Sequence, residues 1–132
     1  MAGVSEMSLE QVRTLGPAAA RSFFRIADAW SMTDDEQMRI LGISSRDALM
    51  RWRDEEDYDA ISPDTLERVS CVLGIFKAIN ILLADPARAD AWMRKANKAP
   101  LFDGDTALDL IAGGDLTRLH ALRAYLDAEL NG

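Results

Sequence analysis

The sequence is poor in the residue types that build disulfides, metal sites and catalytic centres. Its one cysteine, Cys71, cannot form a disulfide within the chain, which suits a reducing compartment. Its one histidine, His120, has no second histidine or cysteine near it for a metal site, and no nucleophile at a readable spacing. No group of residues supplies a nucleophile, a base and an oxyanion donor together. We therefore expect no metal, no cofactor and no enzymatic activity.

Long apolar runs are also missing. The most apolar stretch, residues 69–84, is interrupted by Lys77 and Asn80 and is short for a bilayer crossing. The N-terminus shows no basic segment followed by an apolar run, so the sequence indicates no secretion signal. These features predict a cytoplasmic protein with no membrane segment.

No stretch alternates apolar and polar residues over the length of a strand, whereas apolar residues recur at helical spacing through most of the chain. The sequence therefore predicts an all-α protein, and 132 residues suffice for one domain or for two small lobes that share a core. The net charge is −7, most of it in the first half. This acidity repels nucleic acid on average, and it either favours a basic protein partner or serves solubility alone.

The helical pattern divides the chain into four parts. Residues 1–16 form an N-terminal segment, either ordered or disordered, and residues 17–60 form a lobe of three helices. Residues 61–84 form a long central helix that is apolar around much of its girth, so both lobes are expected to pack on it. Residues 85–132 form a second small helical lobe.

Start and stop signals place the helices of the first lobe. Pro17 is expected in the first turn of the first helix, where its missing N–H costs nothing. Thr33 begins a capping box for the second helix, which is expected to end at Gly42 in a left-handed conformation. Ser44 is expected to cap the third helix, which runs to about Glu55.

Similar signals place the remaining helices. Ser62 and the proline after it begin the central helix, and Asp85 caps a helix that is expected to run to about Ala96. Thr106 and Asp115 are expected to cap a short helix and the final helix, respectively.

The first lobe has the form of a helix-turn-helix, because a short helix, a turn with a glycine and a further helix follow one another. Four side chains lie on the outward side or the flank of the third helix and are candidates for contact with DNA: Arg46, Met50, Arg51 and Arg53. Aspartates on the same face would repel phosphates, and this geometry also occurs in bundles that never touch DNA. Both interpretations stay open.

The aspartate-rich stretch PLFDGDTALDLIAGGDL, residues 100–116, has the spacing of neither a calcium loop nor a repeat. Counted from Asp103, the sixth and twelfth positions of a calcium loop would need glycine and glutamate, but they hold Leu108 and Gly114. The stretch echoes one ankyrin repeat, yet nothing upstream repeats at a period near 33 residues. Its aspartates are expected to serve as turn and cap residues.

Two blocks of sequence resemble the Xre/MbcA/ParS antitoxin family. They are AWSMTDDEQMRILGISSRDALMRW and DAWMRKANKAPLFDGDTALDLIAGGDLTRLHALRAYLDAELNG, and the resemblance covers about residues 20–132. It depends on the residues Trp30, Leu41, Gly42, Ile43, Ser44, Trp52, Trp92, Asn97, Leu101, Gly104, Thr106, Leu108, Leu110, Gly113 and Gly114. The family usually has proline after its G-x-T, where Ala107 stands here. Alanine is a good helix former, so the helix should survive.

The resemblance implies an Xre-like helix-turn-helix lobe that packs through the central helix on a small toxin-binding lobe. It implies an antitoxin that neutralises a cognate RES-domain toxin, which uses NAD, by direct binding. In related pairs the helix-turn-helix lobe dimerises and represses the shared operon. This implies a homodimer within a toxin–antitoxin hetero-oligomer, with operator DNA as a further partner.

The resemblance also implies the toxin-binding residues, which are Trp92, Asn97, Leu101, Tyr125, Asp127, Glu129, Asn131 and Gly132. On this reading the last helix and tail block the toxin's NAD pocket, where a terminal carboxylate could mimic an anionic ligand group and the two acidic side chains could pair with arginines. The simpler alternative is a frayed end on a core helix. An alternative for the whole chain is a stand-alone transcriptional regulator whose C-terminal lobe only dimerises it.

Overall fold

The computed structural model describes residues 9–132 as seven α-helices, with no β-strand in that range, so the all-α prediction is confirmed. The helices are α1 (Leu9–Ala29), α2 (Asp34–Leu41), α3 (Arg46–Arg53), α4 (Pro63–Leu82), α5 (Pro86–Trp92), α6 (Ala107–Ile111) and α7 (Leu116–Asn131). A short 3-10 helix, Tyr58–Ala60, precedes α4.

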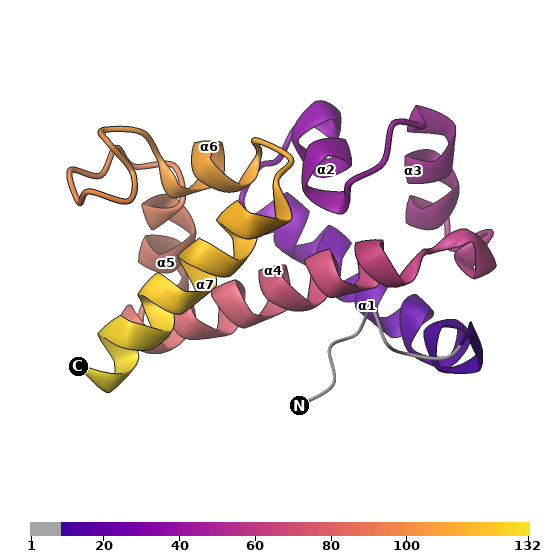
Figure 1. Ribbon diagram of the computed structural model, residues 1–132, viewed down its shortest axis with the longest axis horizontal. Helices are drawn as coiled ribbons and strands as arrows, with labels where there is room; N and C mark the ends of the chain where they lie inside the picture. Colours follow the sequence, from indigo (N-terminus) through magenta and orange to yellow (C-terminus); the bar gives the residue numbers. More distant parts are fainter. Residues whose placement is uncertain (1–8) are drawn as a thin grey trace.

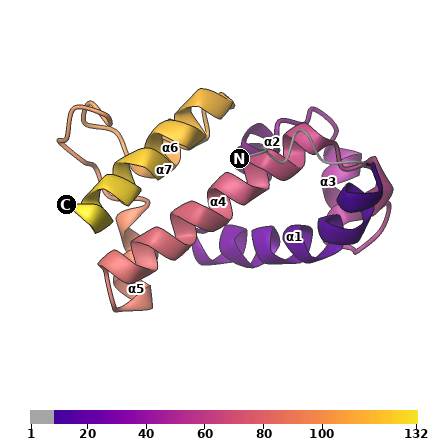
Figure 2. The same ribbon diagram turned by 60° about the horizontal axis from the view of Figure 1, so that its bottom comes forward.

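Helix α4 runs through the middle of the molecule and joins two lobes (Figure 1). Helices α1, α2 and α3 pack around its first half, and α5, α6 and α7 gather around its second half (Figures 1 and 2). Its most extensive contacts are with α7 and α1. The buried residues of both lobes form one continuous core, with Ile75 of α4 fully buried. Within residues 9–132, no helix is both long and apolar enough to cross a membrane.

Most predicted helix starts and stops are confirmed. Thr33 and Glu36 form a complete capping box, with N–H···O distances of 2.8 and 3.1 Å, and Gly42 ends α2 in the left-handed region at φ 73°. The side chains of the other predicted caps accept hydrogen bonds from the first turns of α4, α5, α6 and α7: Ser62, Asp85, Thr106 and Asp115. Each of these bonds spans only two or three residues, which is why local sequence was enough to find them.

Two boundaries of the sequence analysis were wrong. Ser45, not Ser44, caps α3, because the turn after Gly42 needs one more residue before α3 can begin, and the Ser45 hydroxyl accepts from the Ala48 N–H at 3.1 Å. Helix α5 ends at Trp92 rather than near Ala96. The helix ends there because backbone groups a few residues further on form the hydrogen bonds that close a loop, described below.

The start of α1 was also misjudged. The helix begins at Leu9, so Pro17 lies inside it rather than in its first turn. Proline inside a helix removes one hydrogen bond and costs about 3 kcal/mol. The apolar face that follows offsets this cost, because Phe23 and Trp30 are almost completely buried against the core. Of the predicted N-terminal segment, residues 9–16 are therefore helical and residues 1–8 lie outside the described part of the chain.

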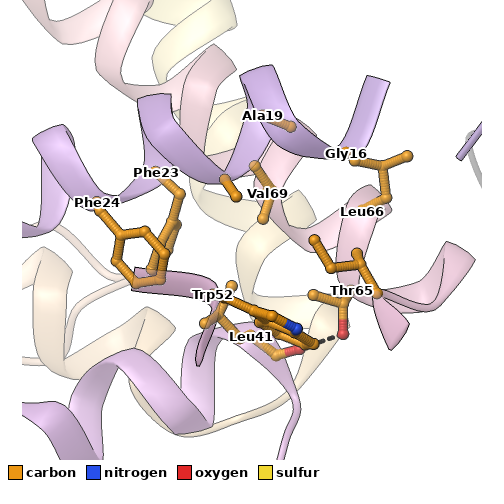
Figure 3. Close-up of a pocket in the computed structure, with 11 residues that line it drawn as sticks. Gly16, Ala19, Phe23, Phe24, Leu41, Trp52, Thr65, Leu66 and Val69 are labelled. Carbon is orange, nitrogen blue, oxygen red and sulfur yellow. Dashed lines mark hydrogen bonds between the residues drawn. The ribbon is translucent and has the colours of Figure 1, made fainter. Parts of the chain in front are cut away.

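The core of the first lobe leaves no room for a ligand. Figure 3 shows a gap in this core, between α1, α3 and α4, lined by Phe23, Trp52 and other apolar side chains. Its volume is about 10 Å³, at the lower limit for a single water molecule. The polar group at its edge is satisfied, since the Thr65 hydroxyl donates to the Leu41 carbonyl at 2.9 Å. This cavity is a packing defect rather than a binding site.

Two arginines tie the lobes together. Arg94, in the turn after α5, donates to the carbonyls of Trp30 and Ser31 at 3.0 and 2.6 Å and pairs with Glu36 at 2.9 Å. Arg68 of α4 pairs with the carboxylate one turn before it and donates to the Gly114 carbonyl at 3.0 Å. These contacts join segments that are 46 to 64 residues apart in the sequence.

Candidate functional site

An open apolar groove lies at the end of the second lobe, where α4, α5 and α7 meet. Its volume is about 130 Å³. It is lined by Ile79, Leu82, Leu83, Trp92, Tyr125, Leu126 and Glu129. Three residues of the predicted toxin-binding set, one aromatic from α5 and two side chains from α7, are therefore brought together here.

Trp92 and Tyr125 form an aromatic wall of this groove, and both contact a third ring, that of Phe102, which does not itself line the groove. Phe102 is buried between Trp92 and Tyr125, and it meets both rings edge to face at centroid distances of 5.8 and 5.3 Å. Such edge-to-face pairs are favourable and hold their rings in fixed orientations. Leu101, also in the predicted set, lies beside Phe102 in the loop, is half-buried and packs against the core. Leu101 therefore helps to hold the loop in place.

Asn97, another residue of the predicted set, organises the loop that carries Phe102. Its backbone N–H donates to the Asp105 carbonyl and its carbonyl accepts from Gly104, at 3.0 and 3.1 Å, which closes the loop. Its side-chain oxygen accepts from the Ala99 N–H at 2.9 Å. Gly104 adopts φ 88°, a left-handed conformation that glycine reaches without strain. Asn97 therefore positions Phe102 and, through it, the aromatic wall.

The remaining members of the predicted set lie at the end of α7. Asp127, Glu129, Asn131 and Gly132 are all exposed. They do not form a loose tail, because the Asn131 side chain donates to the Asp127 carbonyl at 2.9 Å and the Gly132 N–H donates to the Ala128 carbonyl at 2.8 Å. The final turn is therefore an ordered, acidic helix end.

Sequence patterns did not predict Leu82, Leu83 or Phe102 as site residues. The two leucines belong to the apolar stripe of the central helix, which we assigned to the core. Leu82 is in fact 36 % exposed. The sequence did contain a signal for an exposed apolar site here. More apolar residues stand at the end of that helix, directly before the Asp85 cap, than one buried face requires.

The candidate DNA-contacting residues lie on α3 as predicted, but each arginine already has acidic partners. Arg46 pairs with Asp35 at 2.7 Å and with Asp34 at 3.2 Å. Arg53 pairs with the same Asp34 at 2.9 Å. These pairs join the start of α2 to α3, so a phosphate would have to compete with carboxylates of the chain itself.

The other two candidates on α3 also have partners within the chain, acidic ones for Arg51 and a guanidinium for Met50. Arg51 pairs with Asp47 and Asp57 at 3.1 and 3.5 Å. Met50 is half-buried, and its sulfur accepts from the Arg53 guanidinium at 3.7 Å.

The contact between the lobes shifts the pKa of one carboxyl group, that of Glu36. Partial burial by itself would raise the pKa of Glu36, but the hydrogen bond and charge of Arg94 and the Thr33 N–H outweigh it and lower the pKa below 4.5. Glu36 is therefore ionised at neutral pH and serves both the α2 cap and the contact between lobes.

The single cysteine and the single histidine meet in the fold, which their separation in sequence did not suggest. Cys71 Sγ lies 3.5 Å from His120 Nδ1. Burial raises the pKa of the Cys71 thiol above its usual value, although the nearby Arg123 opposes this. A protonated, buried thiol is a poor nucleophile. Among residues 9–132, no three histidine, cysteine or acidic residues are grouped so that they could hold a metal ion.

Comparison with known proteins finds one family domain over most of the first lobe and another over the second. Residues 13–74 match the antitoxin Xre-like helix-turn-helix domain, and residues 78–132 match the antitoxin Xre/MbcA/ParS C-terminal toxin-binding domain. An uncharacterised protein, y4oB of Sinorhizobium fredii (strain NBRC 101917 / NGR234), is 39 % identical over 116 residues, which cover 88 % of this chain and 87 % of that protein. No solved structure matches. The chain therefore belongs to the Xre/MbcA/ParS antitoxin family and is a non-enzymatic Xre-type antitoxin with a C-terminal toxin-binding domain.

Proposed function

We propose that this antitoxin neutralises a RES-type, NAD-using toxin in the cytoplasm, and that the end of α7 blocks the toxin's NAD pocket. The observation that carries the proposal is the match of residues 78–132 to the toxin-binding domain, together with the ordered acidic end of α7 within it. The type of toxin follows from the resemblance described above.

The chemistry of the helix end suits a pocket that holds an anionic dinucleotide. Asp127 and Glu129 are two positions apart, so they lie on opposite sides of α7 and would both face a pocket only if the helix enters end-on. The C-terminal end of a helix also carries partial negative charge. Arginines that hold a pyrophosphate could pair with this acidic end instead. Asn131 and Gly132 would then lie deepest in the pocket.

A shortened chain tests this blocking role. A version that ends at Leu130 lacks the two residues proposed to enter deepest but keeps every residue that lines the groove. We expect it to bind the product of the neighbouring gene but to inhibit that product's NAD consumption more weakly than the full chain does. Asn131→Ala should give a smaller loss in the same direction. Equal inhibition by the full and shortened chains would show that the blocking mechanism is wrong.

We also propose that the antitoxin forms a homodimer within the toxin–antitoxin assembly. Leu15, 47 % exposed, lies at the edge of a second apolar groove, between α1 and α4, with a volume of about 290 Å³. This groove belongs to the helix-turn-helix lobe, the part through which related antitoxins are expected to dimerise. We propose that a second copy of the chain packs into this groove, and sedimentation of the purified antitoxin tests whether it forms a dimer.

A second candidate function is regulation of transcription through α3, either of its own operon or as a stand-alone regulator. It is favoured by the helix-turn-helix form of α2 and α3 and opposed by the acidic partners of the α3 arginines. A mobility-shift assay on DNA upstream of its own gene, with Arg46→Ala and Arg51→Ala, tests it. Unchanged binding by both variants would remove α3 as the reading helix.

A further inference from the structure

The groove beside α7 has an exposed apolar wall that the fold itself does not cover. Leu82, in the last turn of α4, is 36 % exposed and lines the groove. Leu130, one helical turn beyond the buried Leu126 and on the same side of α7, is 37 % exposed. A contiguous exposed apolar patch beside a groove commonly marks a contact with another protein. In Figure 1 the ends of α4 and α7 lie at the same end of the molecule, near the label C.

The size and rigidity of the groove suit one inserted side chain. A cavity of roughly 150 Å³ accepts a benzene ring, so about 130 Å³ is sufficient for most of a leucine or phenylalanine side chain. The ring of Phe102, fixed between Trp92 and Tyr125, holds the aromatic wall in place before any partner binds. A preformed groove loses little conformational freedom on binding, which favours affinity.

The charge around the groove indicates what flanks that side chain. Glu129 lines the groove, and no lysine or arginine is among the lining residues. A basic residue next to the inserted side chain would complement Glu129 and speed encounter. The match to the toxin-binding domain begins at residue 78, so Ile79 and Leu82 fall within it although they belong to the central helix.

We infer that this groove is a toxin-contact site, in which the end of α4 and the side of α7 receive an apolar side chain of the toxin that is flanked by a lysine or arginine. The inference rests on the proposed function for the identity of the partner. It is distinct from blocking of the NAD pocket, because Asn131 and Gly132, the residues proposed to lie deepest in that pocket, do not line the groove; only Glu129 belongs to both sets. On this proposal the central helix α4 both joins the lobes and contacts the toxin directly through its last turn.

Two neighbouring substitutions in the last turn of α4 test the site. Leu82→Asp places a carboxylate in the groove, and Ile81→Asp is its matched control, because Ile81 is more exposed, at 59 %, but does not line the groove. Binding to the purified product of the neighbouring gene is measured by titration calorimetry. We expect Leu82→Asp to weaken binding about 30-fold, which corresponds to roughly 2 kcal/mol. Ile81→Asp and Leu82→Met should stay within about threefold of the unsubstituted chain.

Thermal unfolding of both aspartate variants separates a lost contact from a lost fold. If Leu82→Asp unfolds at the same temperature as Ile81→Asp and binds 30-fold more weakly, the groove is a contact site. Equal binding by the two variants would overturn the inference, even if the unsubstituted chain inhibits NAD consumption. Conversely, a selective loss of binding by Leu82→Asp together with a toxin that consumes no NAD would support the groove and contradict the proposed function.

Discussion

Replacing Arg94 with alanine should loosen the attachment of the helix-turn-helix lobe to the toxin-binding lobe. The guanidinium donates to two carbonyls of the turn between α1 and α2, those of Trp30 and Ser31, and pairs with Glu36 of α2. The Gln37 side chain also donates to this turn, at the Met32 carbonyl at 3.0 Å, but Gln37 belongs to the same lobe as the turn and does not join the two lobes. The substitution removes all three contacts and leaves Glu36 without its cationic partner.

The size of the effect follows from the exposure of the groups involved. A hydrogen bond to a charged group contributes roughly 1.5–3 kcal/mol when it is shielded from water. Because the Arg94 side chain is 41 % exposed, solvent screening reduces each contact to about 0.5–1 kcal/mol. Three such contacts lower the free energy of unfolding by about 2 kcal/mol. For a chain of this size, that corresponds to a decrease in Tm of roughly 6–10 °C.

Urea and thermal unfolding, followed by circular dichroism, measure this difference. Arg88→Ala is the matched control, since Arg88 is an exposed arginine on the neighbouring helix α5. Arg94→Lys should fall between the two, because lysine can keep the ion pair with Glu36 but cannot span both carbonyls. A change of less than about 0.5 kcal/mol for Arg94→Ala, or one equal to that of Arg88→Ala, would refute a role for Arg94 in joining the lobes.

Three further predictions concern charge and assembly. Asp34→Asn removes one carboxylate partner from each of two α3 arginines, Arg46 and Arg53, although Arg46 keeps its pair with Asp35. It should tighten binding to DNA roughly threefold to tenfold at low salt. Asp105→Asn, which makes the same charge change in the other lobe, should not, and equal effects in a mobility-shift assay would show that only net charge matters. Because the pKa of Glu36 is lowered in the folded state, its carboxylate stabilises the fold above about pH 4.5, and this contribution is lost as the pH falls through the lower folded value. Glu36→Gln should therefore lower the unfolding temperature at pH 7 and approach the unsubstituted chain in acid, and a constant difference across pH would contradict this. Leu15→Asp should convert the proposed dimer to a monomer in sedimentation experiments, without a change in toxin binding.

The errors of sequence analysis have simple physical causes. Pro17 was placed at a helix start because proline is most easily accommodated there, but α1 tolerates it internally because burial of the face that follows offsets the cost. Two adjacent serines could each have capped α3, and the length of the turn after Gly42 selected Ser45. The central helix was expected to be covered by both lobes because it is apolar around much of its girth, but Leu82 in its last turn is 36 % exposed.

The sequence by itself determined the helical class, most helix ends, the two-lobe organisation and the family. These features depend on interactions within one helical turn, such as the Thr33 capping box and the Asp115 cap, or on the order of motifs along the chain. Only the tertiary structure decided which side chains meet between helices: those of the groove beside Leu82, those that Arg94 contacts across the lobes, and the α2 carboxylates that pair with the α3 arginines. The interhelical pairs of Arg46 and the contacts of Arg94 join residues 11 to 64 positions apart, and they exist because the packing of the helices brings those residues within a few ångströms of one another.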